Sequence, residues 1–213
     1  MANQRGNNQI ELPQTRIKNL DKEVFFILST ARCRSSWFAN LFTYKDSFCY
    51  NEELRYISNW DELIDRIEQR PEKYVGFEDP ELLHYIETLY ELFPQATYVL
   101  LERDRLESEL SLSRSGNIPP PIVTQKFDRW YEDIKKFKTI VGLYSKLHFE
   151  DMDNMKKVQD IWEYVLPNAP FDIGRWDMLT ALHIHVTLGH KPYPAKKTSM
   201  APYFDFNKLN DVR

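Results

Sequence analysis

The stretch "EVFFILSTARCRSSWF", residues 23–38, decides the fold that the sequence predicts. Its first part, Val24 to Leu28, is a continuous apolar run, which is typical of a strand buried on both faces of a sheet. The run stops at a polar segment with two arginines and several hydroxyl groups, and Trp37 and Phe38 then open a helix-like pattern. A buried strand, a polar loop and a helix in this order predict the first unit of an α/β sheet, in which ligands bind beyond the strand ends.

Strand-like and helix-like segments alternate along the rest of the chain. Further strands are predicted at residues 47–50, 74–77, 96–101 and 146–149, and helices at 34–42, 60–70, 80–93, 105–114, 124–142, 154–166 and 175–186. This order predicts parallel pairing and therefore a three-layer α/β domain, with a mostly parallel central sheet and a P-loop-like first strand–loop–helix unit.

The predicted domain covers residues 21–190. Residues 1–20 are polar and are expected to form a flexible arm, and residues 191–213 are expected to form an irregular, proline-containing tail. The segment "SGNIPPP", residues 115–121, breaks the helical pattern, and we expect an exposed loop there that could act as a lid.

Composition excludes several classes of protein. The net charge of −4 argues against a general nucleic-acid binder, because any anion site must come from local clustering of cations. No apolar run approaches the roughly 18 residues of a membrane span, and the N-terminus has no apolar secretion signal. The two cysteines, Cys33 and Cys49, do not suggest a disulfide framework, so we expect a cytoplasmic protein that does not bind membranes.

The first loop is a candidate anion site. Amide groups at the start of a helix have no intrahelical partner and attract anions, and Ser35, Ser36, Arg32 and Arg34 can add hydroxyl and guanidinium donors. The alternative is an ordinary helix start with two solvated arginines. The Gly-x-x-x-x-Gly-Lys-Ser/Thr pattern of nucleotide hydrolases and kinases is absent. Cys33 is interpreted as a small loop residue and not as a phosphatase nucleophile, because no arginine follows later in the same loop.

A second polar cluster follows the predicted strand at 96–101. Arg103 lies at the strand end and Ser111 comes eight residues later, and together they are candidates for a second phosphate pocket. Two alternatives remain at this stage. Glu102 could hold a metal ion at the strand end, or Arg103 could simply pair with a surface acid such as Glu107.

Taken in series, these segments resemble the sulfotransferases that use 3′-phosphoadenosine 5′-phosphosulfate (PAPS). "ARCRSSW" resembles their 5′-phosphosulfate loop, "RDRLESELS" their 3′-phosphate motif, and "FPQATYVLLERD" and "LHFEDM" two of their strand ends. The likeness covers roughly residues 23 to 170 with the motifs in the family's order. It implies PAPS as the sulfuryl donor, the bisphosphate PAP as a product, and a hydroxyl acceptor that is a small molecule or a peptide.

The resemblance also implies a role for each matching residue. Arg32 stands where the family's catalytic Lys or Arg contacts the sulfuryl group, Ser35 and Ser36 where the 5′-phosphate is held, and Arg103 and Ser111 where the 3′-phosphate is held. The cofactor-binding set that follows is Arg32, Cys33, Arg34, Ser35, Ser36, Trp37, Arg103 and Ser111. Trp37 either stacks near the adenine or fills the core.

"CYNEELRY", residues 49–56, resembles the Gly-Glu-Glu-Thr-Arg segment of protein-tyrosine sulfotransferases. By that likeness Glu53 is the general base and Arg55 assists at the sulfuryl group. A carboxylate suits this role, because the acceptor hydroxyl must lose its proton as it attacks sulfur. The alternative is that Glu52 and Glu53 only begin a helix, where acidic residues are common.

Three features depart from the family pattern. Arg34 replaces the usual loop glycine, which puts a side chain where the backbone approaches phosphate. Glu78 stands where the tyrosylprotein enzymes have a lysine. The glycine-rich 3′-phosphate loop has no counterpart, although Lys196 and Lys197 could close over the nucleotide.

Two rival functions remain, a kinase-like or hydrolase-like nucleotide enzyme and a non-catalytic PAP- or PAPS-binding module. We expect no metal site, because His183, His185 and His190 fit no standard zinc spacing. The sequence does not identify the acceptor or the oligomeric state. Five large aromatic residues could line an acceptor cleft or belong to the core: Trp60, Trp130, Tyr131, Trp162 and Trp176.

Overall fold

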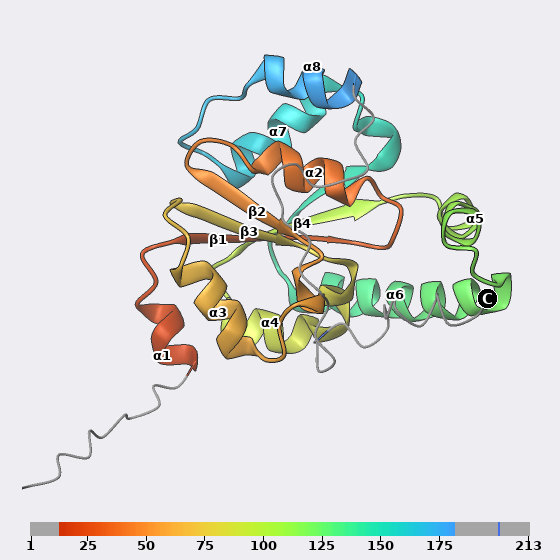
Figure 1. The fold of residues 1–213 in the computed structure, drawn as a ribbon, viewed down its shortest axis with the longest axis horizontal. Coiled ribbons are helices and arrows are strands. Elements are labelled where there is room, and N and C mark those ends of the chain that lie inside the picture. Colours follow the sequence, from red (N-terminus) through yellow and green to blue (C-terminus); the bar gives the residue numbers. More distant parts are fainter. Residues whose placement is uncertain (1–12, 182–199, 201–213) are drawn as a thin grey trace, which may run out of the picture.

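A central sheet of five strands organises the protein, which was studied as a computed structural model that describes residues 13–181 and Met200. The strand order is β2-β3-β1-β4-β5, and every pair is parallel (Figure 1). The strands are β1 (Glu23–Ser29), β2 (Ser47–Asn51), β3 (Tyr74–Glu78), β4 (Thr97–Glu102) and β5 (Ser145–His148). Each lies within one or two residues of its predicted position, and the predicted three-layer α/β class is confirmed.

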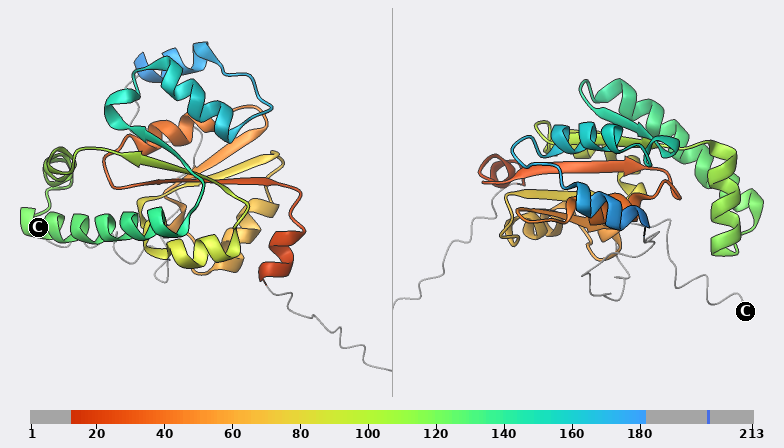
Figure 2. Two further views of the ribbon diagram at one scale, coloured as in Figure 1. Left: turned by 180° about the vertical axis from the view of Figure 1, so that it is seen from behind. Right: turned by 90° about the horizontal axis from the view of Figure 1, so that it is seen from above.

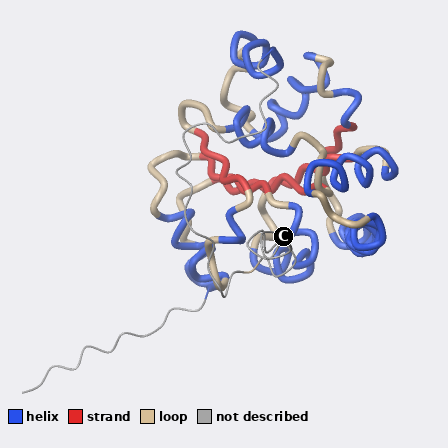
Figure 3. Tube along the Cα trace, turned by 45° about the vertical axis from the view of Figure 1, so that its right-hand side comes forward, coloured by secondary structure: helices blue, strands red, loops and turns tan. Residues whose placement is uncertain are grey.

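Helices cover both faces of the sheet (Figures 1 and 2). One face carries α2 (Ser35–Phe42), α7 (Met155–Val165) and α8 (Ile173–Ala181), and the other carries α1 (Pro13–Lys18), α3 (Trp60–Glu68), α4 (Ile86–Leu92) and α6 (Pro120–Ile140). Helix α5 (Arg105–Gly116) projects at one end of the molecule and packs on α6. The view in Figure 3 shows the sheet sandwiched between these two helical layers.

Strand β1 supplies side chains to both layers, as its apolar run predicted. Phe25 and Ile27 belong to the core under α2 and α7, whereas Phe26 and Leu28 belong to the core on the opposite face. All four are fully buried. Gly76 on the neighbouring strand β3 makes room for Phe25, because a Cβ at position 76 would lie 2.0 Å from a carbon of the Phe25 ring.

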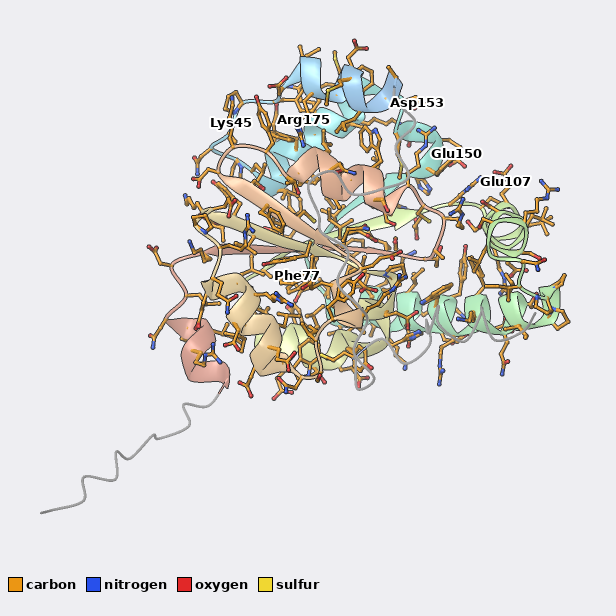
Figure 4. The ribbon with its side chains drawn as sticks, viewed as in Figure 1. Lys45, Phe77, Glu107, Glu150, Asp153 and Arg175 are labelled. Carbon is orange, nitrogen blue, oxygen red and sulfur yellow. The ribbon has the colours of Figure 1, made fainter. Side chains whose placement is uncertain are left out.

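Helix α2 is held at its C-terminal end by Arg175 of α8. The guanidinium donates to the carbonyl oxygens of Leu41, at 3.2 Å, Thr43, at 2.6 Å, and Asn40. These carbonyls belong to the last turn of α2 and to its C-terminal cap, where helix carbonyls lack the usual amide partners four residues ahead. Arg175 thereby fixes α2, whose opposite end begins in the first polar loop (Figure 4).

Three segments differ from the sequence prediction. Residues 80–93, expected as one helix, form a 3₁₀ helix, η2 (Pro80–Tyr85), followed by α4. The prediction of an exposed loop at 115–121 is wrong, because α5 continues to Gly116 and α6 already begins at Pro120. Ile118, between the two helices, is buried. Proline suits the first turn of a helix, so "PPP" starts a helix here and does not form a lid.

The arm predicted for residues 1–20 also differs in its described part. Residues 13–18 form α1, and Arg16 pairs with Asp65 at 2.6 Å and with Glu68 at 2.7 Å on α3. Ile17 and Leu20 pack against the core. The predicted tail lies outside the described residues except for Met200, whose backbone bonds to Ile57 and Tyr85. Within the described part of the chain, no helix is long and apolar enough to cross a bilayer.

Candidate functional site

A pocket of about 440 Å³ lies at the C-terminal ends of β1, β3 and β4, where a parallel α/β sheet binds its ligands. It brings together residues from five separate segments of the chain. The predicted site residues that line it are Arg32, Arg34, Ser35, Ser36, Trp37, Arg55, Arg103 and Ser111. Two predicted site residues, Cys33 and Glu53, do not line it.

The loop between β1 and α2 adopts a glycine-like backbone although it contains no glycine. Arg32 has φ 72° and Arg34 has φ 56°, both in the left-handed region that side chains disfavour. This alternation sends the Cys33 side chain into the core, where it is fully buried and lies 3.4 Å from the Thr30 hydroxyl. Burial raises the pKa of the Cys33 thiol to about 11, so it is not a thiolate nucleophile.

Arg34, which departs from the family's glycine, keeps the glycine conformation and directs its side chain away from the loop. Its guanidinium pairs with Asp153 at 2.8 Å and lies 4.9 Å from the centre of the Phe149 ring. No side chain caps the start of α2. The first amides of this helix therefore remain available to an anion.

Arg103 is fixed by contacts on several sides. Its Nη1 donates to the backbone carbonyl of Arg32 at 2.9 Å, its guanidinium lies 4.0 Å from the centre of the Phe149 ring, and Glu107 pairs with it at 3.3 Å. Its Nε is buried and has no hydrogen-bond partner. Glu107 and Asp153, the acids that pair with Arg103 and Arg34, lie at the end of the molecule where α5 projects (Figure 4).

The two predicted phosphate clusters meet in space. Arg32 Nε donates to Ser111 Oγ at 3.0 Å, although the two residues are 79 positions apart in the sequence. Ser111 lies in the second turn of α5, and the direction of that helix brings its hydroxyl toward the first loop. The first cluster and the second cluster therefore share one pocket, as the resemblance required.

The opposite wall of the pocket is acidic, and sequence reasoning missed most of it. Glu52, Asp79 and Glu81 line this wall. Asp79 accepts hydrogen bonds from the backbone amides of Leu54, at 3.0 Å, and Glu81, at 2.9 Å, so it joins the 3₁₀ turn η1 (Glu53–Arg55) to the start of η2. Burial raises the pKa of Asp79 to about 7 and that of Glu81 to about 8. The Asp-Pro pair before η2, a common helix start, was the only sequence signal for this wall.

Glu53, the predicted base, occupies a different place from the one expected. Its side chain is 2% exposed, and Arg66 Nε of α3 pairs with Glu53 Oε1 at 2.9 Å. Glu52 has φ 53°, which turns the chain so that Glu52 and Arg55 face the pocket and pair at 2.6 Å. The carboxylate that the structure brings beside Arg55 is therefore Glu52.

The alternative metal-holding strand end is not supported. Glu102 pairs with Lys138 at 2.6 Å and with Lys146 at 3.4 Å, and it does not line the pocket. Among the described residues, no group of three His, Cys, Asp or Glu side chains is placed to hold a metal ion. His183, His185, His190, Lys196 and Lys197 lie outside the described residues.

Two aromatic residues line the pocket, Trp37 and Phe149, and Trp37 is mostly buried against Phe38. None of the five other large aromatic residues considered for an acceptor cleft lines this pocket. Trp130 and Trp162 are core residues, and the Tyr131 hydroxyl donates to the Arg103 carbonyl at 3.1 Å.

Solved structures with a similar architecture include two sulfotransferases. A crystal structure of a sulfotransferase from Alicyclobacillus acidocaldarius aligns with a TM-score of 0.53 and 16% identity, over 76% of this chain and 91% of that one. The sulfotransferase domain from the curacin biosynthetic pathway aligns with a TM-score of 0.52 and 12% identity, over 89% of this chain and 96% of that one. The chain has the sulfotransferase fold. No family model matches the sequence, and no curated protein matches it significantly.

The sulfotransferase fold confirms the predicted resemblance at the level of architecture. It covers most of this chain and nearly all of both solved proteins. At identities of 12–16%, the chemistry must be argued from the pocket itself.

Proposed function

We propose that this protein transfers a sulfuryl group from PAPS to the hydroxyl group of a small-molecule or peptide acceptor. The observation that carries the proposal is that both predicted phosphate clusters line one pocket, opposite a wall of carboxyl groups. Such a pocket offers cations for a doubly phosphorylated nucleotide on one side and proton acceptors for a hydroxyl group on the other.

The residues present fit the nucleotide. Arg103 and Ser111 would hold the 3′-phosphate, and the buried Arg103 Nε is a donor in need of an acceptor. Ser35, Ser36 and the first amides of α2 would hold the 5′-phosphate. Arg32, which contacts Ser111 in the same wall of the pocket, would contact the sulfuryl group and the bridging oxygen. PAPS would supply the activated sulfuryl group.

For the base we propose Glu52, in place of the predicted Glu53. Glu52 lines the pocket with its side chain 34% exposed, and Arg55 orients it through the 2.6 Å ion pair. Glu52 takes the hydroxyl proton as the acceptor oxygen bonds to sulfur. The bond between sulfur and the 5′-phosphate oxygen breaks, and its electron pair leaves with the phosphate, whose new negative charge Arg32 and the α2 amides stabilise.

A thermal-shift comparison tests the nucleotide site. PAP should raise the melting temperature, whereas ATP with magnesium should not. The loop lacks the lysine of a magnesium-dependent nucleotide site, and Glu102 at the end of β4 is paired with Lys138 and Lys146. Stabilisation by ATP with magnesium alone would favour the kinase-like or hydrolase-like alternative.

Transfer of labelled sulfate from PAPS to a panel of phenols, alcohols, sugars and tyrosine peptides tests the activity. Transfer that disappears in Glu52→Gln supports the enzyme. Tight PAP binding without transfer to any acceptor would favour a non-catalytic binding module.

A further inference from the structure

Glu78 is a buried acid beneath the phosphate loop that the proposed mechanism does not use. It is the last residue of β3, where it lies between Ile27 of β1 and Asn51 of β2, and it is fully buried. The Ser29 hydroxyl donates to its Oε1 at 3.4 Å. Its Oε2 has no hydrogen-bond partner. A buried polar atom of this kind normally has a partner in the working state of a protein.

The groups around Glu78 disfavour its ionised form. Burial has the largest effect, and the neighbouring Glu52 and Asp79 carboxyls add to it, so the pKa of Glu78 lies well above its usual range. The Cys49 thiol of β2 and the Cys33 thiol also lie near this carboxyl. The hydroxyls of Ser29 and Ser35 favour the ionised form, but they do not outweigh burial.

Ser35 links Glu78 to the ligand side of the loop. It is the first residue of α2, it lines the pocket, and its hydroxyl interacts with the Glu78 carboxyl. A serine hydroxyl has one proton to donate and two lone pairs that accept. If Glu78 donates a proton to the Ser35 oxygen, the Ser35 proton is free to point at an anion. If Glu78 is ionised, the Ser35 proton turns toward the carboxylate instead.

We propose that Glu78 is a positioning residue of the phosphate site, a neutral acid that donates its O–H to Ser35 and so aims the Ser35 O–H at the bound 5′-phosphate. This inference rests on the proposed function, because it needs a phosphate at the start of α2. It assigns a role to an acid in a place where a cation was expected. Ionisation of Glu78 as the pH rises then weakens nucleotide binding.

The main test is the affinity of the full-length protein for PAP, measured by calorimetry in four variants. Glu78→Leu removes the donor at similar volume and should weaken binding about tenfold, the value of one charge-assisted hydrogen bond. Ser35→Ala should weaken binding by a similar factor, and the double variant should lose no more than either single one. Glu78→Gln keeps an N–H donor and should restore binding relative to Glu78→Leu.

Three results would overturn the inference. The first is a Glu78→Gln variant that binds PAP as weakly as Glu78→Leu. The second is a double variant whose loss of affinity equals the sum of the losses from Glu78→Leu and Ser35→Ala. The third is a Glu78 side chain that is ionised at neutral pH. The last is read by infrared difference spectroscopy against Glu78→Gln, where the band of a protonated carboxylic acid should be present in the unmodified protein. If Glu78→Leu does not fold, the infrared spectrum and the PAP affinity of Ser35→Ala still test the inference.

The pH dependence of binding gives an independent readout. As the pH rises, the dissociation constant for PAP should increase over the same pH range in which the infrared band of the Glu78 carboxylic acid disappears. In Glu78→Gln, which has no carboxyl group to ionise at this position, the dissociation constant should not increase over that range. Glu53→Gln is the matched control, because it removes another buried acid that does not line the pocket, and it should keep the rise. If the unmodified protein binds no PAP at any pH, the proposed function fails and this inference fails with it.

Discussion

The two walls of the pocket are built in opposite ways. In the basic wall, the Arg32 side chain donates to the Ser111 hydroxyl, and the Arg103 guanidinium donates to the backbone carbonyl of Arg32. The acidic wall, with Asp79 and Glu81, consists of buried carboxyl groups whose pKa values are raised by burial. Because the pKa values of Asp79 and Glu81 are raised, these two carboxyl groups carry less negative charge near neutral pH than ordinary acids do. The acidic wall therefore opposes a polyanion less than its three carboxyl groups would suggest, which supports the proposed nucleotide site.

The largest expected effect concerns the residue that removes the acceptor proton. Glu52→Gln should lower kcat for sulfuryl transfer about 10²–10⁴-fold, the usual contribution of a general base, with little change in PAP affinity. Glu53→Gln is the matched control, because its side chain faces Arg66 outside the pocket. Steady-state kinetics with both variants decide between the two neighbouring acids, and a larger loss of kcat in Glu53→Gln would restore the base that the sequence predicted.

The next largest effect is expected for PAP binding by the basic wall. Arg103→Gln should raise the dissociation constant for PAP about 100-fold, because it removes a charge-assisted contact to phosphate and the support of the Arg32 carbonyl. Arg105→Gln is the control, since Arg105 pairs with Glu109 and Asp128 outside the pocket. Calorimetry should show an affinity close to that of the unmodified protein for Arg105→Gln. Equal losses in both variants would show that general charge, not the pocket, binds PAP.

The buried Glu81 carboxyl of the acidic wall should make the stability of the protein depend on pH. Glu81 has a folded-state pKa of about 8, above its usual 4.5, so its contribution to stability is complete below about pH 4.5 and is lost as pH rises through 8. Relative to the unmodified protein, Glu81→Gln should gain stability over this window by up to about 1.4 kcal/mol per pH unit. Urea unfolding at several pH values measures the difference. A difference that does not change with pH would mean that Glu81 is ionised throughout.

The smallest effect concerns the strained loop backbone. Arg34→Gly should relieve about 1 kcal/mol of left-handed strain and lose an exposed ion pair with Asp153 that contributes less, for a small net gain in stability. Lys45→Gly is a matched control, because Lys45 has φ 52° in a turn away from the pocket. Thermal unfolding should show similar gains for both. A marked loss of PAP affinity in Arg34→Gly alone would show that the Arg34 side chain binds the nucleotide.

Much of the basic wall was predictable because its signals are local. The apolar run of β1, the hydroxyl-rich loop and the helix start are continuous in sequence, and Arg103 directly follows the next buried strand along this edge of the sheet. Parallel strands bring their C-terminal ends to one edge, so the meeting of the two clusters follows from fold class alone. The expected lid at 115–121 failed because the same prolines that mark loops also start helices.

The acidic wall and the choice of base could not be read in this way. Whether Glu52 or Glu53 faces the pocket depends on one positive φ angle at Glu52, and two adjacent acids give no sequence signal for that angle. The raised pKa values of Asp79 and Glu81 come from burial, which depends on residues distant in the chain.

The sequence by itself determined the parallel α/β sheet, the location of the loop that we propose to bind phosphate and the identity of its arginines, because hydrophobic periodicity and helix-start chemistry act over a few residues. Only the tertiary structure decided which acid stands beside Arg55, that Arg32 reaches Ser111, and that Glu78 lies buried under Ser35. Side-chain direction and desolvation depend on how distant segments pack, and no short stretch of the chain contains that information.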